Sequence, residues 1–358
     1  MIERRQARRV AVGDVAIGGT APIAVQSMTN TDTSDPAATL AQIARLSDAG
    51  CEIVRVAVPH ASALAGFGEI CAASPLPVVA DIHFDHRLAI EAMRLGAAKV
   101  RINPGNIGSL ARVDAVIDAA GAAGISVRLG VNAGSLAAEY QDRDWPLAEK
   151  LFASALSFCE HISGRGFADL VVSAKASSVN STLDAYRRLA PALPYPLHIG
   201  VTEAGTSRSG TVKSSVGLGI LLAEGIGDTL RVSLTADPVE EVLVGWEILG
   251  ALDIRRRGPE LISCPTCGRC EVDMVPIAQE VERRLRGIRT PVKVAVMGCA
   301  VNGPGEARDA DVGVASGKGV GLIFRHGEIV RKVPEAEIVD ALMAEVEALG
   351  REMADPAG

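Results

Sequence analysis

The chain has 358 residues, of which 48% are hydrophobic, and its formal net charge at pH 7 is −7. These values are typical of a globular protein with room for one large or two ordinary domains, and they exclude a disordered chain. The acidic balance and the aromatic content of only 3% argue against a nucleic-acid partner, because phosphate backbones bind basic surfaces and single strands stack on aromatic rings.

The N-terminal segment does not resemble a secretion signal. Residues 1–9 are basic, but they lead into Val10-Ala11-Val12-Gly13-Asp14 rather than into an apolar stretch of signal-peptide length. No run reaches the roughly 18 apolar residues that a membrane-spanning helix needs. We therefore expect a cytoplasmic protein without a membrane partner, in a compartment where thiols stay reduced.

Segments rich in Val and Ile recur along the chain, separated by Ala/Leu-rich stretches of helical period such as residues 37–49, 87–96 and 238–249. The predicted strands are residues 23–28, 52–58, 76–82, 99–103, 126–132, 169–175, 197–203 and 229–235. Eight parallel strands close a barrel, so we predict an α/β fold, a (β/α)8 TIM-type barrel that binds substrate, over residues 1–258. The alternative, a doubly wound open sheet, requires a glycine-rich nucleotide turn after the first strand, where this chain has Thr29-Asn30-Thr31-Asp32-Thr33.

Polar side chains interrupt the predicted strands near their C-terminal ends, although buried parallel strands normally read as continuous apolar runs. Where a strand carries two of them they are two or four positions apart, which puts both on one face of the strand. These residues are Arg55, Asp81 and His83, Arg101 and Asn103, Arg128 and Asn132, Ser173 and Lys175, Glu203, and Arg231 and Ser233. We expect that face to be the barrel lumen, at the end where barrel enzymes hold their active sites.

The charges at this predicted mouth are mostly positive. Any one of them could simply reach solvent, but as a set they are five cations against the carboxylates of Asp81 and Glu203. Because arginine side chains match the geometry of phosphate oxygens, we expect the pocket to bind a phosphorylated or diphosphorylated small molecule.

Glycine-rich turns add little to this prediction. The turn Asn103-Pro104-Gly105 could offer backbone N–H groups to a phosphate or could be an ordinary helix cap. The segment 205–214 is not a P-loop, because Thr211 stands where the lysine belongs.

After Gly250 the pattern changes, and Arg255-Arg256-Arg257-Gly258-Pro259 reads as a charged linker. We predict a small α+β domain over residues 259–358, with helices at 275–286 and 335–349 and strands at 292–297, 312–315 and 321–324. Gly317-Lys318-Gly319 is the predicted turn of a hairpin.

Four of the seven cysteines lie in this second domain. Cys264, Cys267 and Cys270 are spaced as in bacterial ferredoxins, and Cys299 follows in a second glycine-rich segment. This spacing predicts an iron or zinc site, in which a carboxylate such as Glu306, on a Gly-Pro-Gly loop, could be the remaining ligand. We interpret Cys51, Cys71 and Cys159 as core packing residues.

The chain resembles the 4-hydroxy-3-methylbut-2-enyl diphosphate synthase family of the non-mevalonate isoprenoid pathway. The resemblance covers nearly the whole chain and rests on the segments 25–31, 197–205 and 224–234 and on both cysteine segments. It implies an iron-sulfur oxidoreductase that opens and dehydrates 2-C-methyl-D-erythritol 2,4-cyclodiphosphate to 4-hydroxy-3-methylbut-2-enyl diphosphate, with two electrons from flavodoxin or ferredoxin. It also implies the two-domain bacterial form and a homodimer in which the cluster domain of one chain covers the barrel mouth of the other.

The resemblance also implies roles for individual residues. Residues matching the family's ligands to a [4Fe-4S] cluster are Cys264, Cys267, Cys299 and Glu306. Residues that would hold the diphosphate are Arg55, Arg101, Arg128, Asn132, Lys175, Arg231 and Ser233. Glu203 would be an acid/base group. A carboxylate binds iron more weakly than a thiolate does, so Glu306 as a ligand would leave one iron open to substrate.

Two features leave alternatives open. Cys270 stands where the family usually has another residue, so Cys270 could replace Glu306 as the fourth ligand. A barrel that binds a phosphorylated ligand beside a structural zinc module, or an aldolase that uses Lys175 as a Schiff base, would also account for part of the pattern.

Overall fold

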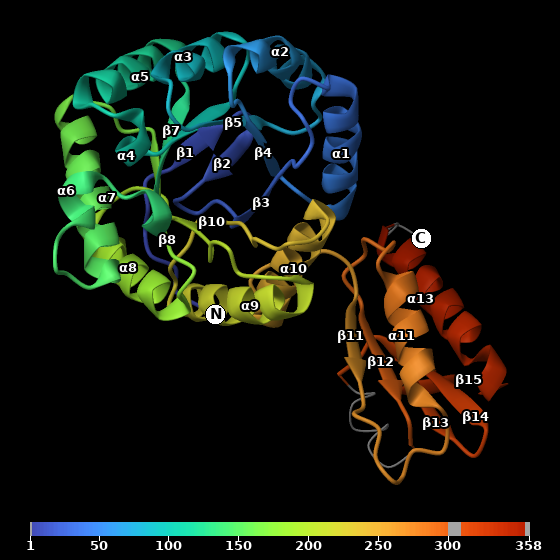
Figure 1. The fold of residues 1–358 in the computed structure, drawn as a ribbon. Helices are drawn as coiled ribbons and strands as arrows, with labels where there is room; N and C mark the ends of the chain where they lie inside the picture. The colour runs from blue at the N-terminus through green and yellow to red at the C-terminus, as the bar shows by residue number, and fades with distance from the viewer. Residues whose placement is uncertain (1, 300–308, 355–358) are drawn as a thin grey trace. The chain divides into compact units, whose positions relative to one another are not determined.

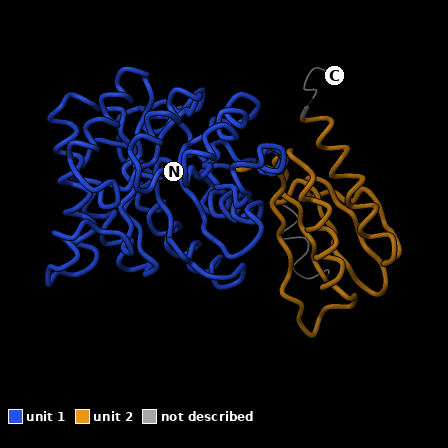
Figure 2. Tube along the Cα trace, turned by 45° about the horizontal axis from the view of Figure 1, so that its top comes forward, with its two compact units in different colours: residues 1–255 blue, residues 256–358 orange. Residues whose placement is uncertain are grey.

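The computed structural model describes residues 2–299 and 309–354. The chain divides into two compact units, Met1–Arg255 and Arg256–Gly358 (Figure 2). Each unit has its own hydrophobic core. No helix in the described part of the chain is long and apolar enough to cross a membrane.

The first unit is a barrel of parallel strands (Figure 1). Its strands are β3 (Ala24–Met28), β4 (Ile53–Ala57), β5 (Val78–Ile82), β6 (Lys99–Ile102), β7 (Ser126–Asn132), β8 (Leu170–Lys175), β9 (His198–Ile199) and β10 (Thr229–Leu230). Their order is β8-β7-β6-β5-β4-β3-β10-β9, and a bridge between Val172 and Leu197 joins β8 to the β9 segment. The predicted TIM-type barrel is therefore confirmed.

Helices surround the barrel (Figure 1). They are α1 (Pro36–Ala49), α2 (Leu64–Ala73), α3 (His86–Arg94), α4 (Pro104–Ile107), α5 (Leu110–Ala123), α6 (Ala138–Gln141), α7 (Leu147–Gly164), α8 (Val179–Ala192), α9 (Ser207–Ala223) and α10 (Pro238–Ala251). Local sequence sets where they begin. Asp35 and Asp237 each accept a backbone N–H of the first turn, and a proline with its fixed φ follows each of them. Asn103 caps α4 in the same way, so its glycine turn forms a helix cap.

The last two barrel strands are shorter than the predicted segments 197–203 and 229–235. After Ile199 the chain reaches Glu203, whose positive φ of 52° is incompatible with an extended strand. After Leu230 the backbone N–H of Leu234 bonds to the Glu241 carboxylate at 3.0 Å. Strands β9 and β10 therefore end before Glu203, Arg231 and Ser233, the polar residues predicted at the mouth.

An N-terminal hairpin, not predicted from the sequence, packs against the barrel. Strands β1 (Val10–Val12) and β2 (Val15–Ile17) pair antiparallel. Val12 and Ile17 form a small apolar cluster with Ala24, Ile53 and Val79, which lie on the first strands of the barrel. Ile53 and Val79 come two residues before Arg55 and Asp81, so this cluster closes the end of the lumen opposite the polar mouth.

The second unit is a five-stranded sheet with the order β11-β12-β13-β14-β15. Its elements are β11 (Glu260–Ser263), α11 (Met274–Leu285), β12 (Lys293–Met297), β13 (Val312–Gly317), β14 (Val320–Arg325), β15 (Glu328–Pro334) and α13 (Ile338–Ala354). Strands β11, β12 and β13 are parallel, and β13, β14 and β15 are antiparallel. Lys318 and Gly319 both have positive φ, 48° and 74°, as a two-residue hairpin of type I′ requires, which confirms the predicted turn.

Gly225 offers a test of the fold. Its φ is +74°, and a Cβ atom there would lie 2.2 Å from the carbonyl oxygen of Glu3 in the N-terminal segment. Gly166 has a similar φ of +82°, but no atom lies within 4 Å of the corresponding Cβ position. We expect Gly166→Ala to cost about 1 kcal/mol from backbone strain and Gly225→Ala to cost about 1–3 kcal/mol more from the clash. Urea unfolding followed by circular dichroism measures the difference. Equal losses would mean that the N-terminal segment does not pack at Gly225.

Candidate active site and cysteine centre

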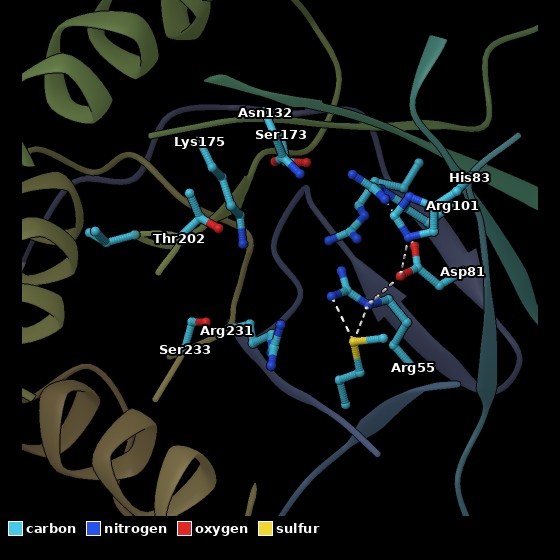
Figure 3. A pocket seen from close by; sticks show the side chains of 13 residues that line it. Arg55, Asp81, His83, Arg101, Asn132, Ser173, Lys175, Thr202, Arg231 and Ser233 are labelled. Atoms are coloured by element: carbon cyan, nitrogen blue, oxygen red, sulfur yellow. Dashed lines mark hydrogen bonds and ion pairs between the residues drawn. The ribbon is translucent and has the colours of Figure 1, made fainter. Parts of the chain in front are cut away.

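A cavity of about 260 Å³ opens at the C-terminal ends of the barrel strands (Figure 3). Its lining residues are Met28, Arg55, Asp81, His83, Arg101, Arg128, Asn132, Ser173, Lys175, Val201, Thr202, Arg231 and Ser233. In Figure 3 the side chains of Arg55, Lys175 and Arg231 point toward the middle of the ring from different strands or strand ends. We call this the barrel cavity.

Asp81 is the only carboxylate among the described residues that line the barrel cavity. Its side chain accepts a hydrogen bond from Arg101 at 3.1 Å and lies 3.6 Å from Arg55 Nε and 3.4 Å from His83 Nε2. Burial alone would raise the pKa of this carboxyl, but Arg55, His83 and Arg101 hold that pKa well below its ordinary value. Asp81 is therefore ionised and fixes the two arginines.

Arg55 also donates hydrogen bonds to a methionine. Its Nε and Nη2 atoms donate to Met28 Sδ at 3.2 Å and 2.9 Å. Burial is the main cause that lowers the pKa of Arg55 to about 10; Asp81 opposes this shift, and the neighbouring cations Arg231 and Arg101 add to it. Crowding of like charges is thus a property of the site and not of one residue.

Arg128 and Lys175 carry the least compensated charge. Arg128 is 1% exposed, and its Nε and Nη1 atoms have no hydrogen-bond partner in the described part of the chain. Lys175 is 9% exposed. Burial, and then the nearby arginines, lower the pKa of both groups well below their ordinary values. An anion that entered the cavity would relieve both effects.

Two glycines make room for these long side chains. A Cβ atom at Gly130 would lie 2.4 Å from Arg101 Nε, and one at Gly200 would lie 2.6 Å from Lys175 Nζ. Arg101 also donates to the carbonyl oxygen of Gly130 at 3.1 Å. The cations can reach the lumen because these neighbouring strand positions have no side chain.

Arg231 is positioned from outside the barrel. Its Nε and Nη2 atoms donate to the two carboxylate oxygens of Glu241 on α10, at 3.2 Å and 3.1 Å. Glu241 is buried and also accepts from Ser27 Oγ at 3.0 Å and from the backbone of Leu234. This two-pronged contact fixes the plane of the guanidinium while its remaining donors face the cavity.

The structure brings together all seven predicted substrate-binding residues. Those lining the cavity are Arg55, Arg101, Arg128, Asn132, Lys175, Arg231 and Ser233. Glu203 is exposed and lies outside this lining, next to Thr202, which is part of it. Its φ of 52° is a left-handed conformation that is uncommon for a residue other than glycine.

Sequence reasoning missed Met28, Val201 and Thr202 in the lining and Glu241 behind it. Met28 and Val201 are apolar residues in apolar segments, so nothing in the pattern marked them. Thr202 had a usable signal, because it adjoins Glu203 in a segment that was already predicted to reach the mouth.

The cysteines lie at one end of the second sheet. Cys264 follows β11, and Gly298-Cys299 follows the adjacent parallel strand β12. The backbone N–H of Gly298 donates to Cys264 Sγ at 3.2 Å. A Cβ atom at Gly298 would lie 3.3 Å from Cys264 Sγ and 2.5 Å from Cys270 Sγ, so the glycine lets this loop approach both sulfurs.

The thiols of these residues match the donor chemistry of an iron-sulfur cluster. Thiols gather at the ends of two paired strands, and an N–H group donates to one of the sulfurs, as such clusters require of their surroundings. Within residues 2–299 and 309–354, no three potential ligands lie close enough together to hold a metal ion. Glu306, the predicted fourth ligand, lies outside the described residues.

Cys270, like Cys264, is partly buried in the second unit. Its Sγ donates to the carbonyl oxygen of Val272 at 3.2 Å, and its side chain packs against the hydrophobic core of the second unit. Cys267 is exposed.

A parallel barrel with a cationic cavity at its mouth, followed by an α+β unit that carries four cysteines, defines a barrel enzyme with a cysteine-bearing second domain. The chain matches the GcpE TIM-barrel domain over residues 7–246 and the GcpE protein C-terminal domain over residues 260–348. It belongs to the GcpE family, which confirms the resemblance noted from the sequence motifs.

Named relatives agree with this assignment. The chain is 56% identical over 347 residues to the 4-hydroxy-3-methylbut-2-en-1-yl diphosphate synthase (flavodoxin) of Geobacter sulfurreducens, covering 97% of this chain and 98% of the relative. It is 51% identical to the Anoxybacillus flavithermus protein of the same name, covering 99% and 98%. Among solved structures, Yersinia pestis dihydropteroate synthase matches 68% of this chain and 97% of its own chain at 12% identity, with a TM-score of 0.49. The named relatives favour the predicted oxidoreductase over the zinc-module binder and the Schiff-base aldolase.

Gly130 offers a test of the barrel cavity. In Gly130→Ala the new methyl group would displace the Arg101 guanidinium from Asp81, since it would lie 2.4 Å from Arg101 Nε. We expect inorganic pyrophosphate to bind at least about 10-fold more weakly, the effect of losing one charge-assisted hydrogen bond. Calorimetric titration measures the affinity. Gly134→Ala is the matched control, because no atom lies within 4 Å of its Cβ position. Unchanged affinity in Gly130→Ala would exclude Arg101 from anion binding.

Proposed function

We propose that this chain converts 2-C-methyl-D-erythritol 2,4-cyclodiphosphate to 4-hydroxy-3-methylbut-2-enyl diphosphate in isoprenoid precursor biosynthesis. One ring C–O bond breaks and one hydroxyl group leaves as water, so the reaction consumes two electrons and two protons. Relatives 56% and 51% identical over nearly their full length carry the name of this enzyme.

The observation that carries the proposal is the charge of the barrel cavity. Five cations and one carboxylate line a space of about 260 Å³. A cyclic diphosphate is small and doubly phosphorylated, and its oxygens would pair with the buried groups that the protein leaves without partners. We assign substrate binding to Arg55, Arg101, Arg128, Asn132, Lys175, Arg231 and Ser233, and to a barrel domain of residues 1–258.

We assign proton transfer to Glu203. It follows Thr202 of the cavity lining, and its left-handed backbone is the kind of local strain that proteins retain at functional positions. From the rim, its carboxyl could protonate the hydroxyl that leaves.

Residues 259–358 would hold a [4Fe-4S] cluster through Cys264, Cys267, Cys299 and Glu306. When bound, such a cluster would supply electrons one at a time and an iron that a weak carboxylate ligand can leave open. The donor would be flavodoxin, which the relatives' names specify, or ferredoxin. We further propose a cytoplasmic homodimer, in which the cluster domain of one chain serves the barrel of the other.

Purification without oxygen tests this function directly. We expect a brown protein with a broad absorption band near about 400 nm and about four irons per chain. With reduced flavodoxin it should release 4-hydroxy-3-methylbut-2-enyl diphosphate from the cyclic diphosphate. A colourless protein with stoichiometric zinc, or a brown protein without turnover, would contradict the proposal.

A pair of cysteine variants tests the ligand set. We expect Cys270→Ser to keep the iron content and the turnover, because this thiol already donates to the carbonyl oxygen of Val272. Cys267→Ser, the same change at an exposed cysteine three positions earlier, should lose both. Iron analysis and the flavodoxin-coupled assay give the two readouts. If Cys270→Ser loses the cluster, Cys270 rather than Glu306 completes it.

A further inference from the structure

A second polar layer lies in the barrel lumen beneath the cavity. Five residues precede by two positions a residue that lines or faces the cavity: Gln26 before Met28, Lys99 before Arg101, Ser126 before Arg128, His198 before Gly200, and Thr229 before Arg231. Residues two apart on a strand share a face, so these side chains also point into the lumen, one layer deeper. We call this set the inner layer.

The inner layer is sealed from solvent and unpaired. Its five side chains are 0–3% exposed. Among the described residues, no hydrogen-bond partner exists for Lys99 Nζ, Ser126 Oγ, Thr229 Oγ1, either ring nitrogen of His198, or either amide atom of Gln26. Buried polar groups in proteins are nearly always paired with protein, water or an ion, so this concentration of unpaired groups indicates a bound species.

The composition of the layer is unusual for its position. Barrel interiors at this depth are normally filled by branched apolar side chains. This barrel follows the rule on β4 and β5, where Ile53 and Val79 occupy the corresponding positions and join an apolar cluster. The departure involves β3, β6, β7, β9 and β10, and on the adjacent strands β6 and β7 the residues Lys99 and Ser126 are register partners.

The charges around Lys99 are positive. Burial, followed by the cations Arg128 and Arg55, lowers its pKa well below the ordinary value. Burial, followed by the cations Lys175, Arg128 and Lys99, also lowers the pKa of His198 well below its ordinary value. Arg128, directly above Ser126 on the same face of β7, cannot lose its proton, and its Nε and Nη1 lack partners among the described residues. Water would pair these donors but would leave the charge uncompensated.

A substrate in the barrel cavity would not compensate the positive charge of the inner layer. Arg128 and Arg101 line the cavity, whereas Lys99 and Ser126 do not. The diphosphate would therefore satisfy the upper cations and leave Lys99 as it is. A separate negative charge is needed below.

We propose that the inner layer binds a small inorganic anion, of the size of chloride, held by Lys99 Nζ and Ser126 Oγ beneath the Arg128 guanidinium. The complete enclosure of the layer favours a monatomic ion over phosphate. The ion supplies the counter-charge that lets Lys99 and Arg128 stay protonated together in the lumen. It is present whether or not substrate is bound.

Bromide tests the proposal, because it replaces chloride and scatters anomalously. Crystals of the anaerobically purified enzyme grown in sodium bromide should show an anomalous peak within hydrogen-bond distance of Lys99 Nζ. Bromide should also raise the melting temperature above its value in sodium gluconate at equal ionic strength. Both effects should disappear in Lys99→Met and persist in Lys213→Met, the same change at an exposed lysine on α9.

If Lys99→Met fails to fold, the anomalous map of the wild-type protein still decides the question. Ser126→Ala, a smaller change, is then the second variant, and we expect its anomalous peak to be weaker than in the wild type. Ordered water without an anomalous signal beside Lys99 would overturn the proposal. So would a bromide-dependent rise in melting temperature that is equal in Lys99→Met and wild type.

Discussion

The physical constraint on which this barrel depends is the repulsion among cations held inside its lumen. Arg55, Arg101, Arg128, Lys175 and Arg231 share one cavity, and Asp81 is the only carboxylate in the described lining. Burial and mutual repulsion depress the pKa values of Arg55, Arg128 and Lys175. The fold holds this arrangement because the apolar interface between strands and helices stabilises the barrel around it.

Several features hold the cations in place at a cost to stability. Asp81 binds two arginines, Glu241 reaches from α10 to hold Arg231, and glycines at 130 and 200 provide space. Each fixes a cation before any ligand arrives. Such preorganisation favours a rigid anion over water, because the donors need not reorganise on binding. It would also let a protein with a net charge of −7 bind an anion at one point.

The sequence predicted the barrel and most of the cavity for one physical reason. Interior strands are nearly all apolar, so charges such as Arg101 and Lys175 stand out, and the two-residue period assigns them to one face. The same reason explains the omissions. Met28 is apolar and gave no signal, and Glu241 looks like an ordinary surface residue until the packing of α10 is known.

Other omissions concern the ends of elements. After β9 the backbone of Glu203 is left-handed, and after β10 the backbone N–H of Leu234 donates to the Glu241 carboxylate. The ends of these two short strands therefore depend on tertiary contacts. Strand β15 has mostly exposed residues and no alternation that a pattern could detect. Lys99 is different, because it lies two positions before Arg101 within a predicted strand, and the same two-residue period could have identified it as a lumen residue.

The central claim is that the barrel cavity binds a diphosphate, whose charge raises the lowered pKa of the buried Lys175. Titration calorimetry of the cyclic diphosphate at about pH 8, where phosphate itself is almost fully ionised, tests it in buffers of different ionisation enthalpy. Binding should raise the lowered pKa of Lys175, so we predict one ligand per chain with net proton uptake. Binding without proton uptake, or no binding, would contradict the account.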